Sequence, residues 1–278
     1  MKVLTIALPT YNREIKILQL LDFLSNEFIC LSDKEKEAIQ VYISDNCSFD
    51  NTENVVKTSQ LFTSTKIEIK YTKNSKNLGL LGNLTKLYST TNSNYIWLMG
   101  DDDCYKPGIV KMVLKQCLFN EYSYIFINHS TIMNGKTINA SVLKDLNYKR
   151  TDKEVIWDLY RASGTVMMFM SACVYKMDYV SKFISKYGVN LVTPCSLSFY
   201  CAAKGQTKII KEPMIINDWT NISWTKFSQR VFYIQIPLML TKMPYWGYSY
   251  VKCYERIFCI WSGGILSYIR HSLNRIIR

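Results

Sequence analysis

The sequence predicts an α/β protein with a mostly parallel sheet flanked by helices. Over the first hundred of the 278 residues, short apolar runs alternate with segments in which apolar residues recur at helical spacing. Three of the runs, Val3–Leu8, Ile39–Ser44 and Tyr95–Met99, end abruptly in polar side chains. Ligands of open parallel sheets bind beyond the carboxyl ends of the strands, so these side chains are expected to meet at one site.

The first half is expected to contain four strands with helices between them. Pro9-Thr10-Tyr11-Asn12 breaks the first strand, and the next helix carries apolar residues at Ile17, Leu20, Leu21, Leu24 and Phe28. Asp45 and Asn46 end the second strand, and Asp50-Asn51-Thr52-Glu53 has the pattern of a capping box at a helix start. A third strand over 67–71, a polar loop, a helix over 80–89 and the strand at 95–99 complete the pattern.

In the second half, the expected strands and helices alternate less regularly. The expected elements are a helix over 108–119, a strand over 124–128, a hairpin within 131–139 at Asn134-Gly135, a helix over 152–161, a strand over 168–175, a helix over 178–186 capped by Asp178, a helix over 196–203, and edge strands at 207–210 and 214–216. From Thr220 onward the composition becomes aromatic and basic. We therefore expect one domain over residues 1–218, divided near residue 108, followed by a helical extension over 219–278.

Three adjacent carboxylates, Asp101, Asp102 and Asp103, follow the apolar run Tyr95–Met99 directly. Like charges this close repel strongly away from bulk water, so the cluster must be solvated, partly protonated, or neutralised by a hard cation such as Mg²⁺ or Mn²⁺. A solvated turn is the simpler alternative, because Lys106-Pro107-Gly108 follows.

The composition argues against a zinc protein, a disulfide-stabilised protein and a membrane-spanning protein. Nine scattered cysteines without a Cys-x-x-Cys pair, and only two histidines, indicate reduced thiols and not a zinc site or a disulfide framework. No run of about 18 apolar residues predicts a membrane span, and the N-terminus has no signal-peptide pattern, so a cytoplasmic protein is expected.

The net charge of +12 is concentrated in the extension, where eight Lys or Arg accompany one acid, Glu255. Near its end, Leu266, Ile269 and Leu273 share one helical face. Such a tail fits an anionic membrane surface or nucleic acid, or it packs on the domain's own core.

Four motifs in order resemble those of the family 2 glycosyltransferases. They are Ala7-Leu8-Pro9-Thr10-Tyr11-Asn12-Arg13, the segment from Ser44 to Thr52, Asn77-Leu78-Gly79 with Asn83, and the acidic motif at Asp101–Asp103. The form Trp97-Leu98-Met99-Gly100-Asp101-Asp102-Asp103 is most similar to bacterial sugar transferases of O-antigen and capsule assembly, the abequosyltransferase-like group.

This resemblance implies a GT-A fold that binds a nucleotide diphosphate sugar and inverts the anomeric carbon with help from Mn²⁺ or Mg²⁺. Implied nucleotide-sugar contacts are Pro9, Thr10, Tyr11, Asn12, Arg13, Asp45, Asn46, Lys76, Asn77, Gly79, Asn83 and Asp101. Tyr11 would stack on the base, Asp45 would accept from a base N–H, and Lys76 or Arg13 would face the diphosphate. Asp102 is the implied metal ligand, with Asp103 as the alternative in a shifted register.

The catalytic base is less clear from sequence. Inverting transfer needs a carboxylate that takes the proton of the acceptor hydroxyl, but the segment Val192–Ser198, where relatives often carry it, has no acid. Asp218 and Asp103 are the candidates, and Glu212 and Asp178 are weaker ones. His129 is another candidate for a ligand or base, although a strand end without a chemical role is the simpler reading.

The resemblance further implies a polyprenyl-diphosphate-linked glycan as acceptor, and a peripheral location on the inner face of a bacterial plasma membrane. The sequence does not specify the sugar, and UDP is the default nucleotide. Two other classes remain open at this point. A nucleotidyltransferase would favour a Gly-rich phosphate loop after the first strand, which Pro9-Thr10-Tyr11-Asn12 is not. A non-catalytic nucleic-acid binder would use the basic tail, yet no nucleic-acid module is evident, so no nucleic-acid partner is expected.

Overall fold

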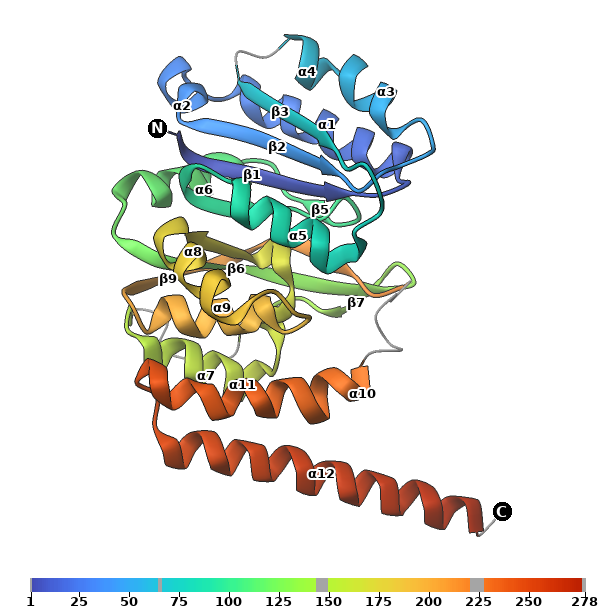
Figure 1. Cartoon of the computed structure of the whole chain (residues 1–278), viewed down its shortest axis with the longest axis vertical. Helices are drawn as coiled ribbons and strands as arrows, with labels where there is room; N and C mark the ends of the chain where they lie inside the picture. Colours follow the sequence, from blue (N-terminus) through green and yellow to red (C-terminus); the bar gives the residue numbers. More distant parts are fainter. Residues whose placement is uncertain (1, 65–66, 144–149, 221–227, 277–278) are drawn as a thin grey trace.

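The computed structural model describes residues 2–64, 67–143, 150–220 and 228–276, with side chains described as far as Gly263 except for Ser64. A nine-stranded sheet runs through the domain in the order β3-β2-β1-β4-β8-β6-β9-β5, with β7 paired to β6. The predicted α/β class is confirmed. Figure 1 shows the C-terminal helices at the end of the molecule opposite α3 and α4.

The first half follows the predicted alternation. Its elements are β1 (Lys2–Thr10), α1 (Glu14–Ile29), α2 (Asp33–Glu37), β2 (Ile39–Asp45), α3 (Thr52–Thr58), α4 (Gln60–Ser64), β3 (Glu68–Lys73), α5 (Gly79–Thr90) and β4 (Ser93–Leu98). β1 pairs in parallel with both β2 and β4, and β2 with β3. All five apolar residues predicted for the first helical stripe are buried on α1. The carboxyl ends of β1, β2 and β4 therefore meet at one edge of the sheet.

The second half adds strands in both directions. Its elements are β5 (Cys104–Tyr105), α6 (Ile109–Phe119), β6 (Tyr122–Met133), β7 (Lys136–Asn139), α7 (Lys153–Ser163), the 3₁₀ turns η1 (Val166–Met168) and η2 (Met170–Ala172), β8 (Cys173–Lys176), α8 (Met177–Tyr187), α9 (Thr193–Ala202) and β9 (Gln206–Asp218). β8 lies between β4 and β6 and is antiparallel to both, whereas β6 and β9 are parallel. The predicted hairpin at Asn134-Gly135 is confirmed, and both residues have positive φ, as a two-residue turn of this kind requires.

Two predicted strand assignments are wrong. Residues 168–175 form a strand only from Cys173, because the preceding segment turns twice as η1 and η2 and hydrogen-bonds through Ser171 to Trp97 and Gly100. The two predicted edge strands at 207–210 and 214–216 are one strand, β9, which is held along its length by β6 with a change of register. β9 is not at the edge, because β5 pairs with its far side.

Two predicted helix caps are also wrong. Asp178 does not cap α8, because β8 runs directly into that helix and Lys176 occupies the N-cap position. The capping box over residues 50–53 does not form, since Asn51 is at the N-cap of α3 without a side-chain bond. Asp50 instead accepts from the backbone N–H groups of Thr52 and Glu14, which joins the start of α3 to the start of α1.

The C-terminal layer consists of α10 (Ser228–Arg230), the π-helical turn η4 (Val231–Gln235), α11 (Ile236–Lys242), the 3₁₀ turn η5 (Met243–Trp246) and the long α12 (Tyr250–Ile276). Cys253 and Ile257 are buried, so the first part of α12 packs on the domain. Leu266, Ile269 and Leu273, which suggested an amphipathic tail, lie outside the described side chains. Within the described residues, no helix combines the length and apolar character needed to cross a bilayer.

Candidate active site

The three carboxylates follow β4 at the edge of the sheet where β1 and β2 also end. The Met99 N–H donates to Ala7 of β1, and the Gly100 N–H donates to Ser171 Oγ at 3.0 Å. A Cβ on Gly100 would lie 2.5 Å from Asp103 Oδ2 and 3.2 Å from Asp102 Oδ1. Only glycine leaves room for both carboxylates to fold back over this position.

Asp101 faces β1 and is 7% exposed. Its Oδ2 accepts from Thr10 Oγ1 at 2.8 Å, and its Oδ1 accepts from Arg13 Nη1 at 2.8 Å. Burial raises the pKa of Asp101, and the neighbouring Asp102 charge adds to this, while Arg13 and Thr10 oppose both effects. Two residues predicted from the first loop are thus fixed directly to the acidic motif.

Asp102 is the most accessible of the three carboxylates. Its side chain is 57% exposed, and its Oδ2 pairs with Arg13 Nη1 at 2.7 Å. Arg13 therefore bridges Asp101 and Asp102. Burial lowers the pKa of Arg13, but the two carboxylates outweigh that effect and raise it, so the guanidinium stays charged.

Asp103 turns toward the second half of the domain. Its Oδ2 accepts from Ser171 Oγ at 2.5 Å, and Ser171 Oγ also accepts from Tyr105 Oη at 3.1 Å. Burial raises the pKa of Asp103 to about 7, the negative charges of Asp102 and Asp101 contribute to the increase, and the Ser171 hydrogen bond opposes it. The motif thus presents carboxylates in three different environments.

The loops after β1 and β2 are joined by hydrogen bonds. The Asn12 N–H donates to Ser48 Oγ at 2.8 Å, and Asn12 Oδ1 accepts from the Phe49 N–H at 3.0 Å. Asn12 has a φ of +50°, which asparagine tolerates better than most residues. The junction presents two exposed rings, Tyr11 and Phe49, edge to face with centroids 6.3 Å apart.

Asp45 is completely buried at the end of β2. Its Oδ1 accepts from the Ser48 N–H at 2.8 Å, and its Oδ2 accepts from Tyr71 Oη at 2.7 Å. Burial raises the pKa of Tyr71, as does this hydrogen bond, so the phenol remains a donor. In this arrangement Asp45 holds the second loop in place, and each oxygen keeps one lone pair for a further donor.

The predicted amide residues form a network between β2 and α5 in which Asn46 and Asn83 are buried and Asn77 is exposed. Asn46 Nδ2 donates to Asn77 Oδ1 at 2.8 Å and to the Gly79 carbonyl at 3.3 Å. Asn83 Nδ2 donates to the Ser44 carbonyl at 3.0 Å, and its Oδ1 accepts from Asn74 Nδ2 at 3.0 Å. These bonds close the 74–79 loop against the strand ends.

The remaining predicted residues lie at or near the same edge. Pro9 is half-buried and pairs with Ser44 in the β1–β2 ladder, and Lys76 is exposed in the 74–79 loop. Asp218 is exposed at the end of β9, two residues beyond Ile216, which pairs with Cys104 immediately after the carboxylates.

The candidate bases differ in their surroundings. Hydrogen bonds from the Thr220 side chain and backbone lower the pKa of Asp218. The acid-free segment 192–198 forms the start of α9. His129 lies in β6 with its ring 4.7 Å from that of Phe169, and burial lowers its pKa to about 4, so it is neutral at pH 7.

Sequence reasoning missed Ser171, Tyr71 and Phe49. Ser171 is 68 residues from Asp103 and reaches it only because η2 packs beside β4, so no local pattern could reveal it. Tyr71 was assigned only to a strand, although a tyrosine one strand away from a buried Asp is a plausible partner. Phe49 lies inside the segment singled out for its resemblance, and its apolar ring in a polar loop was the available signal.

A divalent metal is implied by the resemblance, and the donors fit one in part. Among the residues with described side chains, no three His, Cys, Asp or Glu are grouped closely enough to hold an ion by themselves. Mg²⁺ and similar ions are commonly held by one or two carboxylates together with substrate phosphates. Asp102 is exposed and Asp103 partly so, which suits an ion shared with the substrate.

Comparisons with known proteins agree with this geometry. The sequence model described as Glycosyl transferase family 2 matches residues 5–176. Abequosyltransferase RfbV of Salmonella typhimurium is 33% identical over 101 residues, which are 36% of this chain and 28% of that protein. The chain thus spans about a quarter of the length of this curated relative.

Solved structures share the fold. S. aureus TarS 1-349 in complex with UDP-GlcNAc is 14% identical with a TM-score of 0.64, covering 87% of this chain and 66% of that one. The mannosyltransferase PcManGT of Pyrobaculum calidifontis, solved with GDP-Man and Mn²⁺, is 13% identical with a TM-score of 0.53, covering 92% of this chain and 68% of that one. Because the family match spans more than half of the chain and the four motifs converge at one edge of a GT-A sheet, the chain belongs to glycosyl transferase family 2.

Proposed function

We propose that this protein transfers a sugar from a nucleoside diphosphate sugar, a UDP-sugar by default, to a lipid-linked glycan, with inversion at the anomeric carbon. The observation that carries the proposal is the arginine-bridged acidic motif. Arg13 contacts both Asp101 and Asp102 at the edge where three parallel strands end. UDP is the default nucleotide because it is the commonest in the family that the four motifs resemble; among the structures that share the fold, TarS was solved with UDP-GlcNAc and PcManGT with GDP-Man.

The two joined loops would bind the nucleoside. Tyr11 and Phe49 offer exposed ring faces for a base, and Asp45 keeps a lone pair for a base N–H although it is buried. Asp101, held by Thr10, is the group nearest the first loop and would accept from a ribose hydroxyl. Asn46, Asn77, Gly79 and Asn83 would act mainly by fixing the loop that carries Lys76.

The diphosphate would lie over Arg13 and Asp102. A divalent metal held by Asp102, or by Asp103, would supply Lewis-acid stabilisation to the departing nucleoside diphosphate. Arg13 carries a permanent positive charge beside the same oxygens and would be drawn from Asp102 toward the phosphates when the donor binds.

Removal of the acceptor proton is assigned to one of two carboxylates. Asp103 is partly buried and fixed by Ser171, so its position is well defined. Asp218 is exposed at the end of β9, where an acceptor hydroxyl could reach it from solvent. Separate Asp103→Asn and Asp218→Asn variants distinguish them, because loss of the base should lower transfer while donor binding persists.

The C-terminal layer would bring the enzyme to its acceptor at a membrane surface. Large exposed apolar side chains are concentrated there, on η4, η5 and α12: Tyr233, Ile234, Tyr245, Tyr250, Val251, Tyr254, Phe258 and Trp261. Basic residues accompany them, which suits an interface with anionic lipid. A location on the inner face of a bacterial plasma membrane, and a role in O-antigen or capsule synthesis, are part of this proposal.

The first test is thermal stabilisation by UDP, GDP, CDP and dTDP, each with and without Mn²⁺. A ligand that binds the folded state raises Tm by mass action, so a metal-dependent increase with one nucleotide identifies the donor class. Asp102→Asn should remove the metal-dependent part of that increase and abolish transfer while preserving the fold, whereas Asp22→Asn, an exposed position on α1, should change neither. Full activity in Asp102→Asn would refute the metal assignment.

A further inference from the structure

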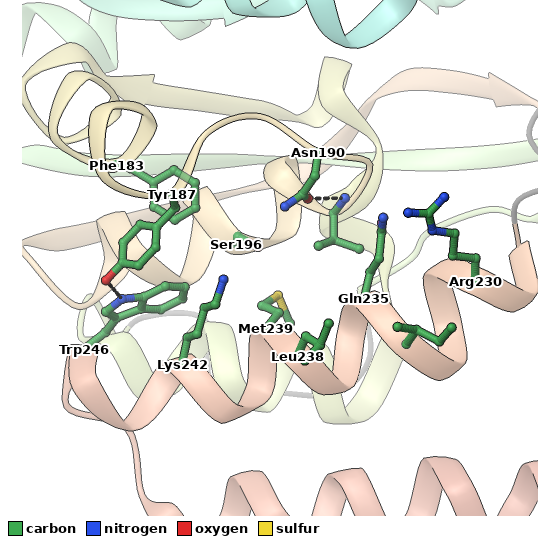
Figure 2. Close-up of a pocket in the computed structure, with 12 residues that line it drawn as sticks. Phe183, Tyr187, Asn190, Ser196, Arg230, Gln235, Leu238, Met239, Lys242 and Trp246 are labelled. Atoms are coloured by element: carbon green, nitrogen blue, oxygen red, sulfur yellow. Dashed lines mark hydrogen bonds between the residues drawn. The ribbon is translucent and has the colours of Figure 1, made fainter.

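A cavity lies away from the carboxylates, between α8–α9 and the C-terminal layer. It has a volume of about 210 Å³. Figure 2 shows Arg230 of α10, Gln235 of η4 and Lys242 of α11 projecting into it from one side, toward Asn190 and Ser196. The cavity is therefore built where the extension meets the domain.

The cavity has an unbalanced positive charge. Arg230 and Lys242 line it, and none of its described lining residues is Asp or Glu. Within the described part of the chain, no salt bridge joins either cation to a carboxylate. Lys242 Nζ instead lies 5.6 Å from the ring centroid of Tyr187. Two uncompensated cations facing one cavity favour an anionic occupant.

Polar and apolar groups also line the cavity. Gln235 Oε1 is buried without a hydrogen-bond partner. Because phosphate oxygens accept hydrogen bonds, only Nε2 of the Gln235 amide could donate to an anionic occupant. Gln235 ends a π-helical turn, and such turns occur frequently at functional sites. Ile234 and Leu238, both more than half exposed, extend an apolar surface from the cavity toward solvent.

No residue of the acidic motif lines the cavity. α9 packs against β8, where Tyr175 Oη donates to the Pro194 carbonyl at 2.8 Å, and Ser196 of the same helix lines the cavity. A group bound there would belong to a part of the substrate remote from the reacting hydroxyl. In Figure 1, α11 lies beyond α9, and α12 lies beyond α11.

We propose that this cavity binds the phosphate or diphosphate head group of an amphiphilic acceptor, with the hydrocarbon leaving along Ile234 and Leu238. The inference deepens the proposed function and rests on it, since it assigns a binding site to the head group of the lipid-linked acceptor. Arg230 and Lys242 supply the positive charge, the Gln235 amide completes the polar lining, and the exposed apolar side chains of the same layer continue toward a lipid surface.

Binding of farnesyl diphosphate, a short soluble isoprenoid diphosphate, tests the proposal by titration calorimetry on the full chain. Wild-type protein should bind it, and the double variant Arg230→Gln/Lys242→Gln should bind it at least about tenfold more weakly for each cation removed. Farnesol should bind much more weakly than the diphosphate, and inorganic pyrophosphate should bind more weakly because it lacks the hydrocarbon. UDP with Mn²⁺ should bind both proteins equally, because none of its proposed contacts lines the cavity.

The matched control is Lys115→Gln/Arg161→Gln, which removes the same charges from exposed helix positions outside the cavity. It should bind farnesyl diphosphate as the wild type does. Equal affinity in the wild type and the cavity variant would overturn the proposal, as would equal binding of farnesol. Pyrophosphate binding as tightly as farnesyl diphosphate would overturn the assignment to an amphiphile. If no nucleotide raised Tm while farnesyl diphosphate still bound the wild type more tightly than the cavity variant, only the donor assignment would be refuted.

Discussion

Gly100→Ala tests whether the crowding of carboxylates around one backbone position is required for activity. The added Cβ would be 2.5 Å from Asp103 Oδ2, whereas a carbon–oxygen contact normally needs about 3.3 Å. The carboxylate must therefore move by roughly 0.8 Å, since the backbone here is held by β1 and Ser171. That movement breaks or lengthens the hydrogen bond from Ser171 to Asp103.

The expected cost in stability is modest. Loss of a hydrogen bond to a charged group costs about 1.5–3 kcal/mol of stability. Replacing glycine by alanine offsets about 0.4–1 kcal/mol of this, because alanine lowers the conformational entropy of the unfolded chain. A net loss of about 1–2 kcal/mol should lower Tm by a few degrees. The effect on activity should be larger, because a displacement of about 1 Å in a catalytic group can cost about a hundredfold in rate.

The assay is release of nucleoside diphosphate in the presence of donor and acceptor, with circular dichroism and thermal unfolding to check the fold. Gly263→Ala is the matched control, since its added Cβ meets no atom within 4 Å. This control should retain full activity and be no less stable. If Gly100→Ala were folded and as active as Gly263→Ala, the reasoning that links the carboxylate positions to catalysis would be wrong.

Three further predictions concern the fold and the extension. Glu27→Ala should lower the free energy of unfolding by about 2 kcal/mol in urea titrations, because Glu27 accepts from the Gly108 and Val110 N–H groups at the start of α6; an unchanged value would contradict this role. Burial lowers the pKa of His129 from its ordinary value of 6.5 to about 4, so the unfolded chain takes up a proton before the folded one and stability falls by about 3 kcal/mol as pH falls from 6.5 to 4. His129→Met should flatten that part of the pH profile of the free energy of unfolding. Ending the chain after Ser262 should move protein from anionic vesicles to the supernatant in a sedimentation assay, and unchanged partitioning would favour packing as the role of the last turns.

Local patterns predicted the elements whose form is set by local chemistry. The stripe from Ile17 to Phe28 could only be a helix packed on a sheet, and Asn134-Gly135 defines its own turn. The polar strand ends were predicted to converge because parallel strands end at a common edge, and the contact from Arg13 to Asp101 fulfils that expectation.

Sequence patterns gave wrong predictions where contacts between residues distant in sequence determine the backbone conformation. Residues 166–172 have the apolar composition of a strand, but Trp97 Nε1 donates to the Ser171 carbonyl, and these tertiary bonds favour two 3₁₀ turns. Asp178 resembles a cap, but the helix begins one residue earlier because β8 leads into it without a loop. The cavity at Arg230 could not be predicted from the sequence either, since residues of α8, α9 and α11 form it together.

The antiparallel strand β8 has a consequence for how the chain acquires its structure. β4 pairs with β1 on one side, but its other side waits for residues 173–176, which are synthesised some seventy residues later. Until then the strand that carries Ile96, Trp97 and Leu98 has an unpaired apolar edge, which is prone to pair with other chains. A fragment cut near residue 108 would keep that edge permanently. The parts of the sheet before and after residue 108 thus acquire their structure together, and the segment that leads into β8 brings Ser171 to the acidic motif.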